Sequence, residues 1–408
     1  GTPSDPMETA FNRATVLIED LDPCYMPDGG IVFTSTRSQN FGRCHGGVYK
    51  PAFLLYRAEA DGSNIRQISF AEANEWDPSV LPDGRIIYTR WDYINRHNTW
   101  FQSLWTTKPD GTATDHYYGN YTRNPCVISE AHSIPGSNQV VATAAAHHFI
   151  TGGSIITVDT QQGRDGPGPL TRITPEVHFP ETEGWDTNGC YATPYPLSEE
   201  LFLAAYTTEP INYGERPSDA AFGIYLVDSL GGRELIYRDA EVSCFTPLPV
   251  RPRSVPPVIP SILPDPDQSP ATGMCYVQDV YQCPEPIPEG SIKYLRINRI
   301  HDQPTPYFTI RSRANQEVVK SVIGVVPVNE DGSAAFEVPA DTGFQLQALD
   351  ENGMAVMTMR SLMYVRPGEV MGCVGCHEYQ AAGQAAAAHS PPRMVVNTPE
   401  PLPGPQYE

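Results

Sequence analysis

A segment that occurs twice near the start of this 408-residue chain constrains its fold more than any other feature. Residues 22–34 align with residues 77–89 without a gap, and both copies open on Asp-Pro and contain Pro-Asp-Gly before a β-branched and aromatic run. Pro-Asp-Gly favours a tight turn and the flanking residues favour strands, so each copy predicts a β-hairpin. A second hairpin signal follows each copy. Four strands in a unit of about 45–55 residues are typical of a β-propeller blade.

Two weaker units follow at residues 134–159 and 195–228, and a further opening strand is expected near Val242. Residues 1–246 therefore predict a partial or split β-propeller of about four blades plus an edge. That number is small for a closed propeller, because unpaired strand edges invite aggregation unless something covers them. We expect residues upstream of Gly1, another chain or the C-terminal tail to close it.

The remainder of the chain divides by composition. Residues 247–270 are rich in proline and predict an extended connector. Residues 271–380 return to strand patterning and predict a compact β-rich domain. Residues 381–408 are rich in Ala, Pro and Gly without a periodic apolar face, and they predict an extended C-terminal arm. The expected fold class is mainly β.

The charge balance excludes one class of partner. The chain carries 48 acidic against 27 basic residues, a net charge of −21. Phosphate binding needs clustered cations, so nucleic acid is not expected as a partner. No apolar run approaches the length of about 18 residues that a membrane-spanning helix needs, so no transmembrane segment is expected.

The sharpest chemical signal is the sequence Cys373-Val374-Gly375-Cys376-His377. Two thiols at this spacing can form thioethers to the two vinyl groups of one haem, and the adjacent histidine can bind the iron. A redox Cys-x-x-Cys pair would need a βαβ context, and a zinc ribbon would need a second close cysteine pair; the sequence indicates neither. We therefore expect one covalent haem c on Cys373 and Cys376, with His377 on the iron.

Covalent haem attachment and nine cysteines together predict an oxidising location outside the cytoplasm, periplasmic or extracellular. An odd number of cysteines cannot all pair, so at least one is a free thiol, a metal ligand or a partner of another chain. Cys275 and Cys283 flank a strand-like run and are the best candidates for a local disulfide.

Other residues are weaker candidates for the haem or a metal. His147 and His148 follow an apolar run, so at strand spacing one faces inward and one outward, either as a distal haem or metal ligand or as a core or turn histidine. Cys126 and Cys190 are either buried structural thiols or thiol ligands of a zinc ion. Tyr379 is the phenol nearest to the haem motif on its C-terminal side.

Several segments taken together resemble the hydrazine synthase alpha subunits and the bacterial proteins that share their middle domain. The strongest stretch runs from Val338-Pro339-Ala340-Asp341 to the haem motif, and the similarity covers about residues 20–380. The resemblance implies a β-propeller followed by a β-rich haem-binding domain. It also implies a component of a larger redox complex, with other redox subunits or cytochromes as partners. The other segments that carry it are residues 22–25, 134–137, 147–148, 236–239, 247–253 and 331–334.

The chain departs from that family at two points. The family carries a second haem in a C-terminal domain, whereas this chain has one Cys-x-x-Cys-His sequence. In the family, a tyrosine four residues after the motif histidine binds the iron, and that histidine holds a zinc ion with a propeller thiol. Here the fourth residue after His377 is Ala381, and Tyr379 lies only two residues after it.

These departures favour iron ligation by His377, with zinc or another metal as the less favoured arrangement. They also favour an electron-transfer or subunit role over catalysis. The alternative is a haem enzyme of the hydrazine synthase type acting on a small nitrogen compound such as hydroxylamine or ammonia.

Overall fold

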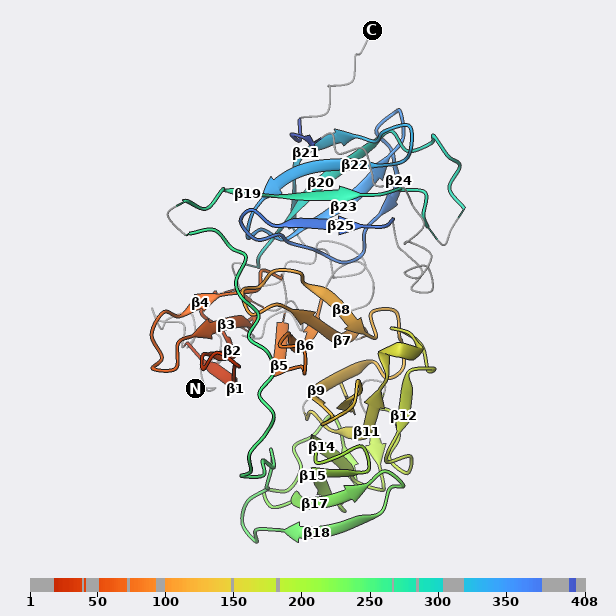
Figure 1. Ribbon diagram of the computed structural model, residues 1–408. Helices are drawn as coiled ribbons and strands as arrows, with labels where there is room; N and C mark the ends of the chain where they lie inside the picture. Colours follow the sequence, from red (N-terminus) through yellow and green to blue (C-terminus); the bar gives the residue numbers. More distant parts are fainter. Residues whose placement is uncertain are drawn as a thin grey trace, which may run out of the picture.

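The computed structural model describes most of the chain, and its regular structure is almost entirely β. Apart from a 3-10 turn at Thr160–Gln162, every regular element in the described residues is a strand. The prediction of a mainly β fold is confirmed. The strands form a propeller-like domain and a second domain above it (Figure 1). The described residues are 18–38, 40–41, 51–71, 74–92, 100–147, 150–180, 184–265, 268–283, 286–303, 319–375 and 396–400.

Four blades of four strands follow one another along the first part of the chain. The first is β1 (Asp20–Tyr25), β2 (Ile31–Ser35), β3 (Leu54–Ala58) and β4 (Arg66–Gln67). The second is β5 (Asn74–Val80), β6 (Ile86–Trp91), β7 (Gln102–Thr107) and β8 (Asp115–Tyr118). The third is β9 (Val127–Ser133), β10 (Val140–Ala145), β11 (Gly153–Val158) and β12 (Leu170–Arg172). The fourth is β14 (Cys190–Pro196), β15 (Leu201–Thr207), β17 (Gly223–Asp228) and β18 (Arg233–Tyr237), with the short pair β13 (Trp185–Asp186) and β16 (Ile211–Asn212) beside it.

The repeated Pro-Asp-Gly segments form the same turn in the first two blades. Gly29 and Gly84 both adopt a positive φ, at 88° and 89°. In each turn the aspartate Oδ1 accepts the backbone N–H two residues later, from Gly30 at 3.1 Å and from Arg85 at 3.0 Å. These contacts confirm the predicted turns. Glycine is favoured at both positions because a residue with a Cβ would be strained at a positive φ.

The first strands of neighbouring blades are linked by a series of hydrogen bonds that we call the inner ladder. Each first strand is irregular where one residue adopts a left-handed backbone, and that side chain accepts the N–H of the equivalent residue in the next blade. The backbone N–H of Glu130 donates to Asp77 Oδ2 at 3.2 Å, and the backbone N–H of Thr193 donates to Glu130 Oε2 at 2.6 Å. The five residues are Asp22, Asp77, Glu130, Thr193 and Thr246, with φ from 47° to 58°. Side-chain oxygens that accept backbone N–H groups thus link successive blades.

The second domain is a sandwich of two four-stranded sheets. One sheet has the order β25 (Val370–Cys373), β19 (Thr272–Val277), β22 (Ala334–Pro339) and β26 (Val396–Asn397). The other has the order β21 (Val319–Pro327), β20 (Tyr294–His301), β23 (Phe344–Leu349) and β24 (Ala355–Thr358). Side chains from both sheets, including Leu295, Phe336 and Phe344, form one core. The β-rich second domain is confirmed, and residues 396–397 of the predicted C-terminal arm belong to its first sheet.

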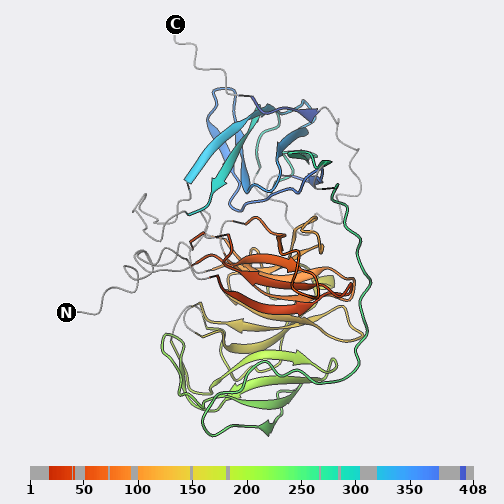
Figure 2. The same cartoon turned by 90° about the vertical axis from the view of Figure 1, so that its left-hand side faces the viewer.

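The connector predicted from proline content is extended. Between β18 and β19 no strand is assigned in the described residues, and this segment runs alongside the propeller from the fourth blade to the second domain (Figure 2). Arg253 donates to the Tyr195 hydroxyl at 3.1 Å, and Ile262 N–H donates to Asp110 Oδ2 at 2.9 Å. The connector is therefore attached to the propeller at both ends. No helix among the described residues is long and apolar enough to cross a membrane.

Candidate haem site and the interface beneath it

Cys373, the first cysteine of the haem motif, is the last residue of β25, an edge strand of the second domain. β25 pairs in parallel with β19, which places Cys373 opposite Val277. The backbone carbonyls of Cys373 and Val374 accept N–H groups from Gln278 at 2.9 Å and Asp279 at 3.0 Å. The strand and the turn after β19 therefore fix the start of the motif. Its other predicted ligands, Cys376, His377 and Tyr379, lie outside the described residues.

The glycine of the motif is required by its surroundings. A Cβ added at Gly375 would lie 2.1 Å from the backbone carbonyl oxygen of Gln282, a distance at which the two segments would have to separate. Gly372, one residue before Cys373, is packed against the Tyr276 ring in a similar way, with a Cβ contact of 2.2 Å. Residues 372–375 therefore pack closely against residues 276–282.

The predicted disulfide between Cys275 and Cys283 is not formed, and both residues are free thiols. Cys275 lies on β19 and points into the sandwich core, where it is only 3% exposed. Burial, together with the nearby Cys373, raises the pKa of its thiol. Cys283 follows the next turn and contacts Met357 instead, with 3.9 Å between the two sulfur atoms. The two cysteines are close in sequence, but their thiols do not meet, because Cys275 faces the core and Cys283 faces β24.

The weaker propeller candidates lie in packed surroundings. The His147 ring makes an edge contact with Trp91 at 4.9 Å between centroids, and its Nδ1 is hydrogen-bonded to the Gln102 side chain. Cys126 is buried and its Sγ contacts the carbonyl oxygen of Pro180 at 3.5 Å. Cys190 is fully buried in the core of the third and fourth blades, and burial raises the pKa of its thiol. His148 lies outside the described residues.

Those of the propeller candidates that the structure describes do not assemble into a metal site by themselves. Within the described ranges, no group of three or more His, Cys, Asp or Glu side chains is placed to hold a metal ion. Cys126 and Cys190 belong to different core clusters. Zinc ligation that includes His377 stays a prediction, since that residue is outside the described residues.

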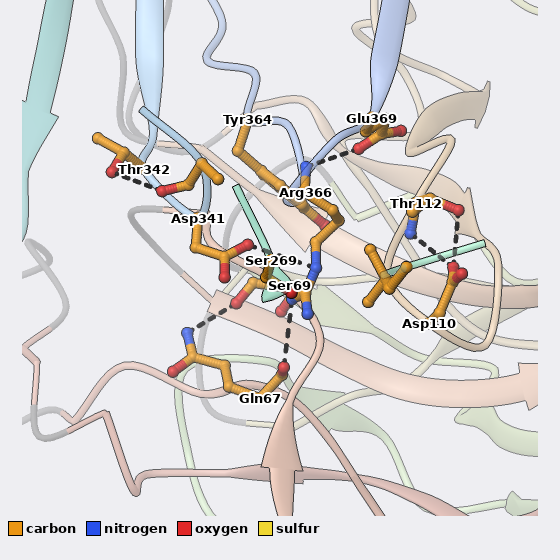
Figure 3. Close-up of polar contacts among 12 residues, drawn as sticks. Gln67, Ser69, Asp110, Thr112, Ser269, Asp341, Thr342, Tyr364, Arg366 and Glu369 are labelled. Atoms are coloured by element: carbon orange, nitrogen blue, oxygen red, sulfur yellow. Dashed lines mark hydrogen bonds and ion pairs between the residues drawn. The ribbon is translucent and has the colours of Figure 1, made fainter. Parts of the chain in front are cut away.

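Residues 366–369, which lead into β25, are hydrogen-bonded to the propeller. The Glu369 carboxylate accepts the backbone N–H of Ala113, between β7 and β8, at 2.6 Å and that of Arg366 at 2.7 Å. Arg366 in turn donates to the carbonyl oxygen of Gln67 at 3.3 Å and forms an ion pair with Asp341 at 3.3 Å (Figure 3). Glu369 directly precedes β25, so the first two blades fix the strand that carries Cys373.

A buried charged cluster supports the same interface from the second blade. Arg90 is 1% exposed, and its guanidinium donates to Asp92 Oδ1 at 2.9 Å and to the carbonyl oxygen of Leu362, in the second domain, at 2.9 Å. It also lies over the Trp105 ring, 4.3 Å from the centroid. Glu75 is fully buried beside it and accepts a hydrogen bond from the Ser69 hydroxyl.

Tyr364 joins the two domains close to this cluster. It is 1% exposed, its hydroxyl is 2.8 Å from Thr114 Oγ1, and its ring makes an edge contact with Phe70. The structure places Tyr364 in the core of the interface, where burial of its ring and the hydrogen bond of its hydroxyl stabilise the contact between the two domains.

The Glu75 carboxyl makes the stability of the propeller depend on pH. Burial raises its pKa from 4.5 to about 7, against the opposing charge of Arg90. Because this pKa is above that of the unfolded chain, the folded state binds the proton more tightly between the two values. Stability from this group is full below pH about 4.5 and is lost as the pH rises through about 7.

Glu75→Gln keeps the shape of the neutral side chain but cannot ionise. We therefore expect its free energy of unfolding, relative to that of the wild type, to increase by about 2–3 kcal/mol as the pH rises from 5 to 8. Urea unfolding followed by tryptophan fluorescence measures this, because all five tryptophans lie in the propeller part of the sequence. A difference between the two proteins that is the same at both pH values would contradict the expectation.

Comparisons with known proteins find similarity to hydrazine synthase both in sequence and in structure. Residues 290–378 match the model of the hydrazine synthase alpha subunit middle domain. Hydrazine synthase subunit alpha from Kuenenia stuttgartiensis is 23% identical over 377 residues, which cover 79% of this chain and 44% of that protein. The solved structure of Kuenenia stuttgartiensis hydrazine synthase matches with a TM-score of 0.70 and 19% identity, over 85% of this chain and 51% of that one.

The chain thus spans about half the length of the relatives that it matches. The β-propeller domain of the Trilobed protease from Pyrococcus furiosus also matches, with 12% identity over 56% of this chain and 59% of that one. Its TM-score of 0.30 is too low to support a conclusion.

Proposed function

This chain is a relative of the hydrazine synthase alpha subunits, and from that premise we propose that it is a c-type haem redox protein. Its role would be that of an electron-transfer or subunit component of a larger redox complex. The observation that supports this best is the position of Cys373. It ends an edge strand that both the second domain and the propeller hold in place.

The residues present fit a covalent haem. Cys373 is half-buried at the end of a strand, whereas its neighbour Cys275 is enclosed in the core, so of these two cysteines Cys373 is the more exposed. Cys373 and Cys376 would hold the porphyrin, and His377 would bind its iron. Bound haem supplies one-electron chemistry. The chain's own contribution is to fix the attachment point through β19, Gly375 and the Glu369 contact to Ala113.

Location and partners follow from the same proposal. Covalent attachment of haem implies an oxidising compartment, periplasmic or extracellular. The net charge of −21 favours redox partners, such as cytochromes or other subunits, that present basic surfaces. The alternative function is catalysis at an open iron on hydroxylamine or ammonia. The similarity over 79% of the chain is the observation that favours it.

Absorption spectra of the purified chain, produced with a haem-attachment system, test the proposal. We expect one haem per chain by the pyridine haemochrome method and a reduced spectrum that carbon monoxide does not change, because a haem that only transfers electrons would leave no iron position open to an added ligand. A chain without covalent haem would overturn the proposal. A carbon monoxide complex would show an open iron position, and it would replace the electron-transfer role with the enzyme alternative.

A further inference from the structure

The strand that carries Cys373 lies on the same side of the second domain as β24. β25 is the edge strand of one sheet, and β24 is the edge strand of the other. On the opposite side β22 contacts β21, so the strand order brings β24 and β25 to the same side of the sandwich. Met357 on β24 and Cys373 both pack against the core that the two sheets share, and both are half-buried. Two sulfur-containing side chains therefore reach this core from opposite sheets.

Met357 and Cys373 also lie at the same end of the sandwich. β25 ends at Cys373, beside the last residue of β19 and the first residue of β22. Met357 is opposite Ala348, next to the end of β23, which lies beside the start of β20 and the end of β21. The turn at residues 329–333 joins the end of β21 to the start of β22, so these strand ends belong together.

A chain of contacts connects the haem motif to Met357. The carbonyl oxygen of Gln282 lies against Gly375, where an added Cβ would approach it to 2.1 Å. The next residue, Cys283, contacts Met357, with 3.9 Å between the two sulfur atoms. The residue that packs on the motif and the residue that contacts Met357 are therefore neighbours in the chain.

The strand β24 is irregular at Met357. Met357 is opposite Ala348, whereas the residue opposite the next position of β23, Leu349, is Ala355, so β24 contains one extra residue there. Such bulges change the direction in which a side chain points and are frequent beside functional sites.

A methionine in this position has the chemistry of a haem ligand. A thioether sulfur is a soft, neutral donor, and together with histidine it is one of the recurrent axial ligands of c-type haem iron. Met371 packs on the same core, but it lies on β25 itself, two residues before Cys373. His147, a candidate distal ligand from the sequence, lies in the propeller, where its Nδ1 is hydrogen-bonded to Gln102. Met357 is therefore the candidate that approaches the attachment point from the facing sheet.

We propose that the Sδ atom of Met357 is an axial ligand of the iron of the haem attached at Cys373. This rests on the proposed function, because it requires the covalent haem. It also deepens that function, since Met357 would fill the iron position that the enzyme alternative leaves open.

Met357→Leu in the full, haem-loaded chain tests the proposal, because leucine keeps the apolar volume but has no donor atom. The proton NMR spectrum of the reduced wild type should contain the strongly shifted methyl signal of an iron-bound methionine, and the variant should lose it. We expect the variant to keep one haem per chain, to bind carbon monoxide when reduced, and to have a lower reduction potential, because a thioether ligand raises that potential. Met357→His should restore a spectrum that carbon monoxide does not change.

Met371→Leu is the matched control, because it makes the same substitution against the same core. It should keep the methionine signal and the insensitivity to carbon monoxide, as should Cys283→Ser. A wild type without the methionine signal, or a signal lost in Met371→Leu and kept in Met357→Leu, would overturn the proposal. A carbon monoxide complex formed by Cys283→Ser and not by Met357→Leu would identify the thiol as the ligand and also overturn it. Absence of covalent haem would overturn the proposed function as well, whereas the other outcomes leave haem attachment intact.

Discussion

Replacing Cys373 and Cys376 together by alanine is expected to abolish covalent haem attachment. The two thioethers are the only covalent links between a c-type haem and its protein, and the sequence contains no second Cys-x-x-Cys-His motif. Denaturing gels stained for haem and the pyridine haemochrome assay measure the loss. We expect haem content to fall from one per chain to none.

Cys244→Ser is a suitable control, because Cys244 is a partly exposed thiol in the propeller, away from the second domain. It should keep full haem content. Covalent haem that persists in the double variant would contradict the assignment of the motif. The wavelength of maximum tryptophan emission of the double variant should match that of the wild type, since the tryptophans lie in the propeller.

Local features of the fold could be predicted from the sequence because turn chemistry is local. Pro-Asp-Gly at residues 27–29 and 82–84 determines a positive-φ glycine whatever the rest of the chain does. Near the opening strand expected at Val242, residues 243–249 repeat the Thr-Pro pattern of the fourth blade and Thr246 adopts the same left-handed backbone, but no strand is assigned there among the described residues. The resemblance to hydrazine synthase alpha subunits was also confirmed, since it rested on a long stretch of specific residues.

Features that depend on distant contacts could not be predicted. The contact between Glu369 and Ala113 joins residues that are 256 positions apart, and no local pattern indicates it. The Cys275–Cys283 prediction was wrong for the same reason, since proximity in sequence did not determine which way each thiol faces. The role of Arg90 could have been predicted from the sequence, because a charged residue within the largely apolar and aromatic strand Ile86–Trp91 indicates a buried charge that needs a partner.

Replacing Arg90 by alanine is expected to produce the largest loss of stability. Its guanidinium bonds both Asp92 and the Leu362 carbonyl in a site that is 1% exposed, and removing it leaves buried acceptors without a partner. Breaking a buried ion pair from one side costs about 3–5 kcal/mol. Urea unfolding followed by tryptophan fluorescence should show that loss in the propeller.

Arg85 provides the matched comparison within the same blade. It forms an ion pair with Asp83 at 2.8 Å, but the Asp83 side chain is 52% exposed, and exposed pairs contribute about 0–1 kcal/mol. Arg85→Ala should therefore change stability little. Equal effects of the two substitutions would contradict the view that burial makes Arg90 important.

The Arg90 substitution also separates two roles of the interface. If the Leu362 contact fixes the segment that leads to β25, Arg90→Ala should increase hydrogen exchange in residues 361–373 as well as in the second blade. An increase in hydrogen exchange that is confined to the propeller would show that Arg90 stabilises only its own blade. The Glu369 contact to Ala113 would then be the link that positions Cys373, because it directly precedes the strand.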